Sequence, residues 1–148
     1  MSDNVQVVCG NCDSVVRLPR QRLGDGPRCS NCHHALFGAK PIELTEKNFD
    51  RHLQRSELPV VVDFWAPWCG PCIAMAAGYE TVARRLEPKF RFAKLNTQDE
   101  PAPAGRFGIR GIPTLIVFRD GKEAARQTGA MDAHSLTRWL SSTGLASD

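Results

Sequence analysis

All six cysteines of the chain stand in Cys-x-x-Cys pairs, which serve in proteins as metal ligands or as reactive dithiols. Two pairs, Cys9/Cys12 and Cys29/Cys32, lie near the N-terminus and are separated by sixteen residues. This spacing is typical of a zinc site in which four thiolates complete a tetrahedron and leave no position open for a substrate. The sequence therefore predicts one structural zinc ion bound by these four cysteines, with two disulfides or an iron site as the alternatives.

The segment that carries these two pairs, residues 1–38, has too few apolar residues to form a hydrophobic core of its own. Metal binding would supply the missing folding free energy, on the order of 10 kcal/mol. We expect His33 and His34 to be exposed, because four cysteines already fill the coordination shell. With its zinc–thiolate centre the segment is slightly negative, and Phe37 is its only aromatic residue, which argues against nucleic-acid binding.

The third pair, Cys69/Cys72, follows a run of β-branched and aromatic residues that predicts a buried strand over residues 58–65. A helix is predicted to begin at Cys69, where unpaired backbone N–H groups and the helix dipole would favour a thiolate. Cys72 lies on the same helical face but deeper. We interpret Cys69 as an exposed nucleophile that forms a mixed disulfide with a substrate, and Cys72 as the thiol that resolves it.

A carboxylate interrupts the apolar strand. Asp63 is expected to be buried with a raised pKa, because burial disfavours the charged form. It is then a candidate proton acceptor for Cys72; the alternative is an aspartate on a solvated face. Lys94 ends the next predicted strand and is a candidate neighbour of Asp63, although taken alone it suggests an ordinary exposed lysine.

The pattern of elements predicts a small module over residues 1–38 and an α/β domain over residues 39–148, with a mixed sheet flanked by helices. The predicted elements are strands over 5–8 and 15–18, a helix capped by Thr45 and ending near Gln54, strands over 58–65 and 90–95, a helix over 69–86, a short helix over 102–107, a hairpin of 114–118 and 122–128 around Asp120-Gly121, and a last helix capped by Asp132 that carries Leu136, Trp139 and Leu140 on one face.

The segment Trp65-Ala66-Pro67-Trp68-Cys69-Gly70-Pro71-Cys72 resembles the active-site segment of the thioredoxin family. Further motifs follow in thioredoxin order, and the match covers roughly residues 42–142: Val62-Asp63-Phe64, Lys94-Leu95-Asn96, Gly111-Ile112-Pro113-Thr114, Asp120-Gly121 and Thr128-Gly129-Ala130. The resemblance implies a thioredoxin fold preceded by a zinc-ribbon-like module. The four-cysteine head is similar to that of the thioredoxin-2 class of bacterial thioredoxins, in which the head is associated with oxidative stress.

The resemblance also implies a cis peptide between Ile112 and Pro113 that holds the substrate chain beside the dithiol. It places Asp63, Lys94 and Pro113 with Cys69 and Cys72 in the catalytic site. The implied docking surface consists of Trp68, Gly70, Pro71, Ile112, Pro113, Gly129 and Ala130. We expect Trp65 to be packed in the core instead.

Two positions depart from the family pattern. Ala77 stands where many thioredoxins have a proline that kinks the helix, so the kink is expected to be absent unless Gly78 supplies flexibility. Ile73 stands where a basic residue is common, which makes the docking rim less positive and could shift the choice of partner. Neither position is expected to alter the thiol chemistry.

The implied function is reduction of protein disulfides, followed by re-reduction by thioredoxin reductase with NADPH. The expected partners are thioredoxin reductase and oxidised substrate proteins; the alternative function is a docking scaffold whose zinc head recruits a partner, and an oxidase or isomerase fits the Gly-Pro dipeptide less well. The net charge of +3 and the short apolar runs argue against nucleic acid and membranes. The N-terminal residues do not resemble a secretory signal, so we expect a cytoplasmic protein. We also expect the protein to be a monomer.

Overall fold

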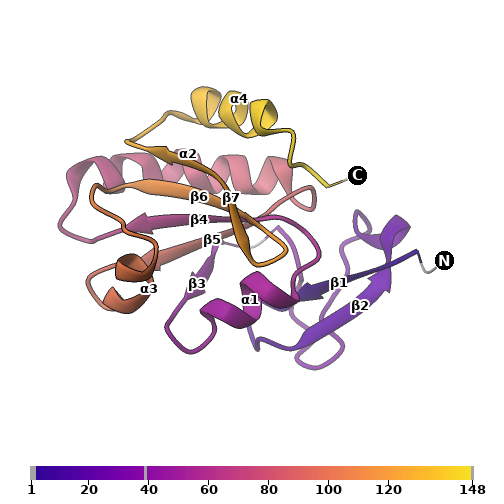
Figure 1. Ribbon diagram of the computed structural model, residues 1–148. Helices are drawn as coiled ribbons and strands as arrows, with labels where there is room; N and C mark the ends of the chain where they lie inside the picture. The colour runs from indigo at the N-terminus through magenta and orange to yellow at the C-terminus, as the bar shows by residue number, and fades with distance from the viewer. Residues whose placement is uncertain (1–2, 39, 148) are drawn as a thin grey trace.

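The computed structural model describes residues 3–38 and 40–147, which form two β-sheets and their helices (Figure 1). The N-terminal head contains an antiparallel pair, β1 (Asn4–Val8) and β2 (Val15–Pro19), followed by the short 3-10 helix η1 (Arg20–Arg22). The remaining strands form one five-stranded sheet in the order β3-β5-β4-β6-β7. The mixed sheet flanked by helices confirms the predicted fold class.

Most elements of the five-stranded sheet and its helices lie close to their predicted ranges; the exceptions are β3, which was not predicted, and the start of α1. The strands are β3 (Ile42–Leu44), β4 (Val60–Trp65), β5 (Arg91–Asn96), β6 (Thr114–Arg119) and β7 (Lys122–Thr128). The helices are α1 (Phe49–Arg55), α2 (Gly70–Leu86), α3 (Pro101–Arg106) and α4 (Ala133–Thr143). Within the described ranges, no helix is both long and apolar enough to cross a lipid bilayer.

The central strand β4 pairs in parallel with β5 and antiparallel with β6, so both of its edges are hydrogen-bonded. Its side chains alternate between the two faces of the sheet. Val60, Val62 and Phe64 pack in the core with α1, whereas Val61 packs in the core with α2 and α4. Asp63 therefore points to the face that α2 covers. This alternation brings an acidic side chain beneath the helix that begins at the dithiol.

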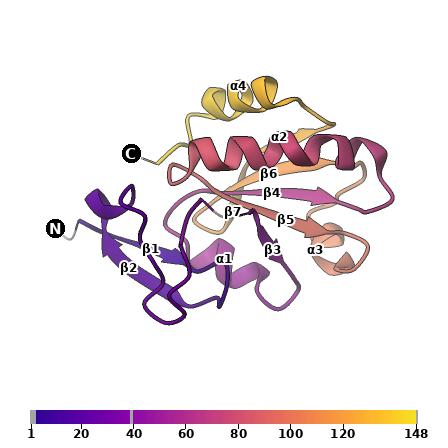
Figure 2. The same ribbon diagram turned by 180° about the vertical axis from the view of Figure 1, so that it is seen from behind.

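The helices cover both faces of the sheet, α2 and α4 on one and α1 and α3 on the other (Figure 2). Tyr79 anchors α2 to the sheet, because its buried hydroxyl donates a hydrogen bond to the carbonyl oxygen of Ala93 at 2.7 Å. The helix runs without interruption through Ala77 and Gly78. Gly78 lies against Ala133 at the start of α4.

The N-terminus of α1 differs from the prediction. Thr45 does not cap this helix, which begins four residues later with Asn48 at the N-cap position. The Thr45 hydroxyl instead accepts a hydrogen bond from the Lys47 N–H, and the Asn48 side chain accepts one from the Thr45 N–H. These local bonds to side chains stabilise a turn in place of the first helical turn.

The predicted hairpin and last helix are confirmed. Asp120 and Gly121 both have positive φ, 54° and 79°, as a two-residue hairpin turn requires. Asp132 caps α4 by accepting a hydrogen bond from the Ser135 N–H at 2.7 Å.

The head has a small core, contrary to the prediction that it lacks one. Its buried residues are Val5, Val7, Val16, Leu18, Leu23 and Leu36, packed around the four cysteines and against Leu58 of the segment that leads into β4. Sequence composition underestimated this core because part of it comes from the cysteines and part from the larger sheet's side of the interface.

Arg91, at the start of β5, connects the head to the rest of the chain. Its guanidinium donates hydrogen bonds to the carbonyl oxygens of Leu36 and Val8, forms an ion pair with Glu87 and stacks over the ring of Phe37. The Arg91 side chain is 4% exposed and that of Glu87 is 7% exposed. A buried guanidinium of this kind is tolerated only because all of these partners are present.

A second contact joins the head to α1. Asp13, which follows Cys12, accepts a hydrogen bond from His52 at 2.7 Å and one from Asn48 at 3.4 Å. Its backbone carbonyl also accepts a bond from Arg51. Burial lowers the pKa of His52 and its contact with Asp13 opposes this effect.

The head therefore lies at the end of the sheet where β4 and β5 begin (Figure 1). Glu57, just before β4, donates its backbone N–H to the carbonyl oxygen of Gln6 at 2.9 Å. Gly38 donates its N–H to the side chain of Glu87, which caps the C-terminus of α2.

We predict that Arg91→Ala lowers the free energy of unfolding by about 3 kcal/mol, because it leaves buried carbonyl oxygens and a buried carboxylate without their partner. Urea denaturation followed by tryptophan fluorescence measures this change. Arg85→Ala, which removes an exposed arginine from the last turn of α2, is the matched control and should change stability by less than about 0.5 kcal/mol. Equal effects of the two substitutions would contradict the role assigned to Arg91.

Candidate active site and metal centre

Cys69 and Cys72 form a disulfide at the N-terminus of α2, with their Cα atoms 5.3 Å apart. Cys69 is the N-cap residue, and its Sγ accepts a hydrogen bond from the Cys72 N–H at 3.2 Å. Pro71 occupies the first helical turn, where its missing N–H is not needed. On reduction, the same N–H group and the helix dipole would stabilise a thiolate at Cys69.

The two sulfurs differ less in exposure than the sequence predicted. Cys69 is only 5% exposed and Cys72 is 2% exposed, so neither residue is open to solvent as a whole. Cys69 nevertheless precedes the helix while Cys72 lies within its first turn. The two cysteines thus differ mainly in their position at the helix end and little in exposure.

The peptide bond between Ile112 and Pro113 is cis, as the resemblance implied. The Ile112 carbonyl oxygen lies 3.7 Å from Cys69 Sγ, so this loop is in contact with the dithiol. Pro113 is buried, and its carbonyl oxygen accepts a hydrogen bond from the Gly129 N–H at 2.9 Å. This bond fixes the loop to the segment that connects β7 to α4.

Two large apolar side chains are exposed in the described part of the chain, and both lie beside the dithiol: Trp68 is 71% exposed and Ile73 is 54% exposed. The rest of the implied docking surface is small or partly covered: Gly70, Pro71 and Ala130 are exposed, and Ile112 and Gly129 are half-buried. Trp65 was expected in the core; it is instead half-buried and packs against the two cysteines at the edge of the core.

Asp63 is 3% exposed, which confirms the predicted burial. Burial raises its pKa to about 7, and the positive charge of Lys94 opposes that rise. Its Oδ1 is the one buried side-chain oxygen or nitrogen in residues 3–38 and 40–147 that has no hydrogen-bond partner. A buried carboxyl group with a pKa near neutrality can exchange a proton at physiological pH.

Lys94 is opposite Asp63 in the β4–β5 register, so the predicted proximity of the two residues is confirmed. The Lys94 ammonium lies 4.1 Å from the ring centroid of Trp65. The aromatic ring holds the positive charge near the carboxyl group without a direct ion pair being formed.

The four head cysteines come together as predicted. Their Sγ atoms all lie within 4.8 Å of one another, and the distances Cys9–Cys32 and Cys12–Cys29 are both 3.6 Å. A tetrahedral zinc site with Zn–S bonds near 2.3 Å has sulfur–sulfur edges of about 3.8 Å. The cluster therefore has the size and the donor set that a four-thiolate metal site requires.

Backbone and side-chain N–H groups point at these sulfurs. The Asn11 N–H donates to Cys9 Sγ at 3.3 Å and the Asn31 N–H donates to Cys29 Sγ at 3.4 Å. The two asparagine side chains reach across to the other pair, Asn11 to Cys32 and Asn31 to Cys12. Such donors stabilise the thiolate form that metal binding needs.

Their different surroundings give the thiols of the cluster unequal affinities for protons. A hydrogen bond from the backbone at His34 is the main cause that lowers the pKa of Cys32 to about 5, whereas burial raises the pKa of Cys9 to about 12. A metal ion would have to displace the proton from the more buried thiol on binding.

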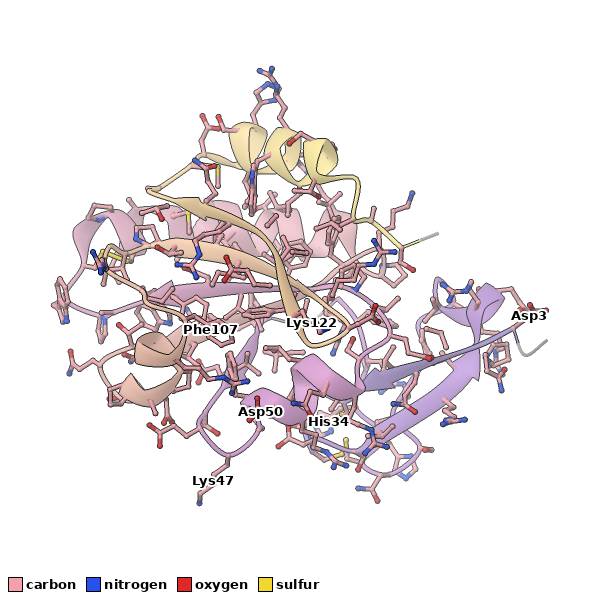
Figure 3. The ribbon with its side chains drawn as sticks, in the orientation of Figure 1. Asp3, His34, Lys47, Asp50, Phe107 and Lys122 are labelled. Carbon is pink, nitrogen blue, oxygen red and sulfur yellow. A yellow bond between two sulfur atoms is a disulfide. The ribbon has the colours of Figure 1, made fainter. Side chains whose placement is uncertain are left out.

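The two histidines beside the cluster are exposed, as predicted. His34 lies in the head (Figure 3), and its Nδ1 is 3.1 Å from the side-chain nitrogen of Asn11. His33 follows Cys32 with a positive φ of 67°, which turns the chain after the second pair.

The residues that connect the four-cysteine cluster to the rest of the chain were not predicted from the sequence. Asp13, His52 and Arg91 are separated widely along the chain, and none belongs to a motif. Arg91 offered a weak signal, since a charged residue directly after a chain turn and within an apolar strand pattern implies a buried partner.

The comparisons with known proteins agree with this geometry. Residues 40–142 match the model of the thioredoxin family. The chain is 41% identical to thioredoxin C-3 of Corynebacterium nephridii over 134 residues, which cover 90% of this chain and 92% of that protein. It is 39% identical to thioredoxin 1 of Nostoc sp. over 98 residues, which cover 66% of this chain and 92% of that protein.

The first relative shares more than the larger domain, because 134 aligned residues exceed the 110 residues from 39 to 148. Its similarity to this chain therefore extends into the four-cysteine head. With its dithiol at the start of α2, its cis-proline loop and its buried aspartate, the chain belongs to the thioredoxin family of thiol–disulfide oxidoreductases, and it carries the N-terminal cysteine head of the thioredoxin-2 class.

Proposed function

We propose that this chain reduces disulfides in proteins, with Cys69 as the nucleophile and Cys72 as the resolving thiol. The observation that carries the proposal is the hydrogen bond from the Cys72 N–H to Cys69 Sγ at the N-cap of α2. This donor stabilises a thiolate at Cys69, and only a thiolate attacks a disulfide at a useful rate.

The reaction proceeds in two exchanges. The Cys69 thiolate attacks one sulfur of the substrate disulfide, and the other sulfur leaves as a thiolate. Cys72 then transfers its proton toward Asp63 and attacks Cys69 Sγ, so that the substrate's second sulfur leaves and the Cys69–Cys72 disulfide forms. Asp63 suits this role because it is buried on the α2 face with a pKa of about 7. Lys94 assists by limiting the rise of that pKa.

The surface around the dithiol would hold the substrate chain. Pro113 and the Ile112 carbonyl present backbone beside Cys69, and Trp68 and Ile73 present exposed apolar area. Gly70, Pro71, Gly129 and Ala130 add backbone that a substrate can approach closely. The partners are oxidised proteins and an NADPH-dependent thioredoxin reductase that restores the dithiol.

In the head, Cys9, Cys12, Cys29 and Cys32 would hold one structural zinc ion, with the boundary to the thioredoxin domain at residues 38–41. Zinc would supply a fixed tetrahedral link between the two cysteine turns. The thiolates can also be oxidised by peroxide, which would release the ion and fits a role in the oxidative-stress response. A reducing compartment such as the cytoplasm would keep the four thiols available for the metal.

We predict that Cys69→Ser abolishes insulin reduction, because the substitution removes the attacking thiolate at the N-cap of α2. Cys72→Ser should retain the first exchange and accumulate mixed disulfides with substrate proteins. Turbidity of reduced insulin measures the first effect, and mass spectrometry of the trapped adducts measures the second. Appreciable insulin reduction by Cys69→Ser would overturn the assignment of the nucleophile.

We predict that the oxidised protein loses stability between pH 4 and pH 7 through Asp63. Its pKa is about 7 when folded and 3.8 in the reference state, so the folded state binds more protons in this range and the free energy of unfolding falls as pH rises. About three pKa units correspond to a loss on the order of 4 kcal/mol. Asp63→Asn should remove this dependence and be the more stable protein at pH 8.

Urea unfolding at pH 5 and pH 8 tests this prediction. Asp120→Asn, an exposed position in the β6–β7 turn, is the matched control and should keep the wild-type pH dependence. If Asp63 accepts the proton of Cys72, Asp63→Asn should also slow resolution of a preformed mixed disulfide by about 10²-fold at pH 7. An unchanged resolution rate would leave Asp63 without a part in the chemistry.

We predict that the purified, reduced protein contains one zinc ion per chain. Titration with peroxide should release the zinc in step with the loss of the four head thiols, as measured by a chromogenic chelator and by thiol counting. Cys69→Ser/Cys72→Ser should bind the same amount of zinc, whereas Cys32→Ser should bind less. A wild-type protein without zinc would refute the metal assignment, and zinc that stays bound as the head thiols oxidise would refute the redox response.

A further inference from the structure

The head and the dithiol lie at opposite ends of the larger sheet. Cys69 caps the N-terminus of α2, whereas Glu87 at the C-terminus of the same helix contacts Gly38 of the head and Arg91, whose side chain also binds the head. A helix of 17 residues is roughly 25 Å long. This placement prevents the dithiol from reaching the head of its own chain.

The sulfurs of the head are arranged to form two disulfides when they are oxidised. Cys9 and Cys32 are 3.6 Å apart, and so are Cys12 and Cys29. Each of these pairs joins a buried cysteine to a partly exposed one. Oxidation by hydrogen peroxide converts two thiols to a disulfide and two molecules of water, so an oxidised head holds disulfides with one accessible sulfur each.

Of the two accessible sulfurs, that of Cys32 is the better target. The residues around it, Ser30, Asn31, His33, His34 and Ala35, are all exposed. The turn at Cys12 is less open, because the neighbouring Asp13 is held by Asn48, Arg51 and His52 of the α1 region. A protein that binds the backbone beside a disulfide can therefore approach Cys32 freely. To approach Cys12 it would have to break the contacts of Asp13 with α1 and its N-cap.

We propose that the oxidised head of one molecule is a substrate for the Cys69/Cys72 dithiol of a second copy of this chain, and that the attack occurs at Cys32. The inference rests on the proposed function of the dithiol. It gives the enzyme a second activity, the repair of its own metal site, that must be intermolecular because the two sites are separated by the length of α2.

Bonds, electrons and protons balance in this exchange. The Cys69 thiolate of the second copy attacks Cys32 Sγ, the Cys9–Cys32 bond breaks, and Cys9 leaves as a thiolate. Cys72 of the second copy, after losing its proton, attacks Cys69 Sγ and Cys32 leaves as a thiolate. Two electrons pass from the dithiol to the head, the second copy ends with a Cys69–Cys72 disulfide, and the two protons of its thiols are passed to the head thiolates or to solvent.

The test uses a substrate that cannot reduce itself. Cys69→Ser/Cys72→Ser protein, labelled with ¹⁵N, is oxidised with peroxide in the presence of a chelator, freed of both reagents and mixed with reduced, unlabelled wild type. Alkylation and mass spectrometry should show that the labelled chain regains free thiols at Cys9 and Cys32 while the unlabelled chain becomes oxidised at Cys69 and Cys72. With Cys72→Ser as the unlabelled partner, the trapped link should join Cys69 to Cys32.

Concentration dependence separates the intermolecular reaction from an internal one. In wild type with an oxidised head and a reduced dithiol, tenfold dilution should lengthen the half-time of head reduction about tenfold, as expected for a bimolecular exchange. An unchanged half-time would overturn the inference, as would a trapped link to Cys12 or Cys29.

Insulin reduction by the same wild-type preparation shows whether the dithiol itself is active. If insulin is reduced and the labelled head is not, self-repair is refuted and the proposed function stands. If neither is reduced, both are refuted.

Discussion

The backbone pairing of β4 on both edges is the constraint on which the rest of the structure depends. A strand paired in this way and covered by helices on both faces must be apolar almost throughout. The one carboxylate it contains, Asp63, is consequently buried under α2 with a pKa near neutrality. The same strand ends next to the dithiol and begins next to the head, so its two ends support two different kinds of cysteine chemistry.

The local structure at each cysteine pair determines which chemistry the pair is suited to perform. At the end of β4 the chain enters a long helix, and Cys69 and Cys72 lie in succession at its positive end. In the head, the two pairs lie in turns that face each other, and asparagine N–H groups bind the sulfurs. One arrangement presents a single stabilised thiolate to a substrate, and the other places four thiolates around one point.

Much of this arrangement could be predicted from the sequence, because local patterns determine it. The apolar run of β4, the Asp120-Gly121 turn and the capping Asp132 each specify structure over a few residues, and the cysteine spacings specify the pairs. The interface between the head and the sheet could not be predicted, since Arg91, Asp13 and His52 act through partners distant in sequence. Thr45 was assigned wrongly as a cap because serine, threonine and asparagine side chains stabilise turns as readily as helix ends.

The separation of the two sites has a chemical consequence of its own. A reactive thiolate placed beside four metal-binding thiolates would exchange with any disulfide formed among them, and a chain could then become trapped in an internal cross-link. Because the length of α2 separates Cys69 from the head, a Cys69–Cys32 bond within one chain would require the head to leave its place at the end of the larger sheet. The interface centred on Arg91 maintains that distance. Glu87, at the C-terminal end of α2, binds the Gly38 N–H, and the Arg91 side chain, at the start of β5, binds the carbonyl oxygens of Leu36 and Val8. The contacts that stabilise the head thus also keep the two dithiol chemistries of this chain independent within a single molecule.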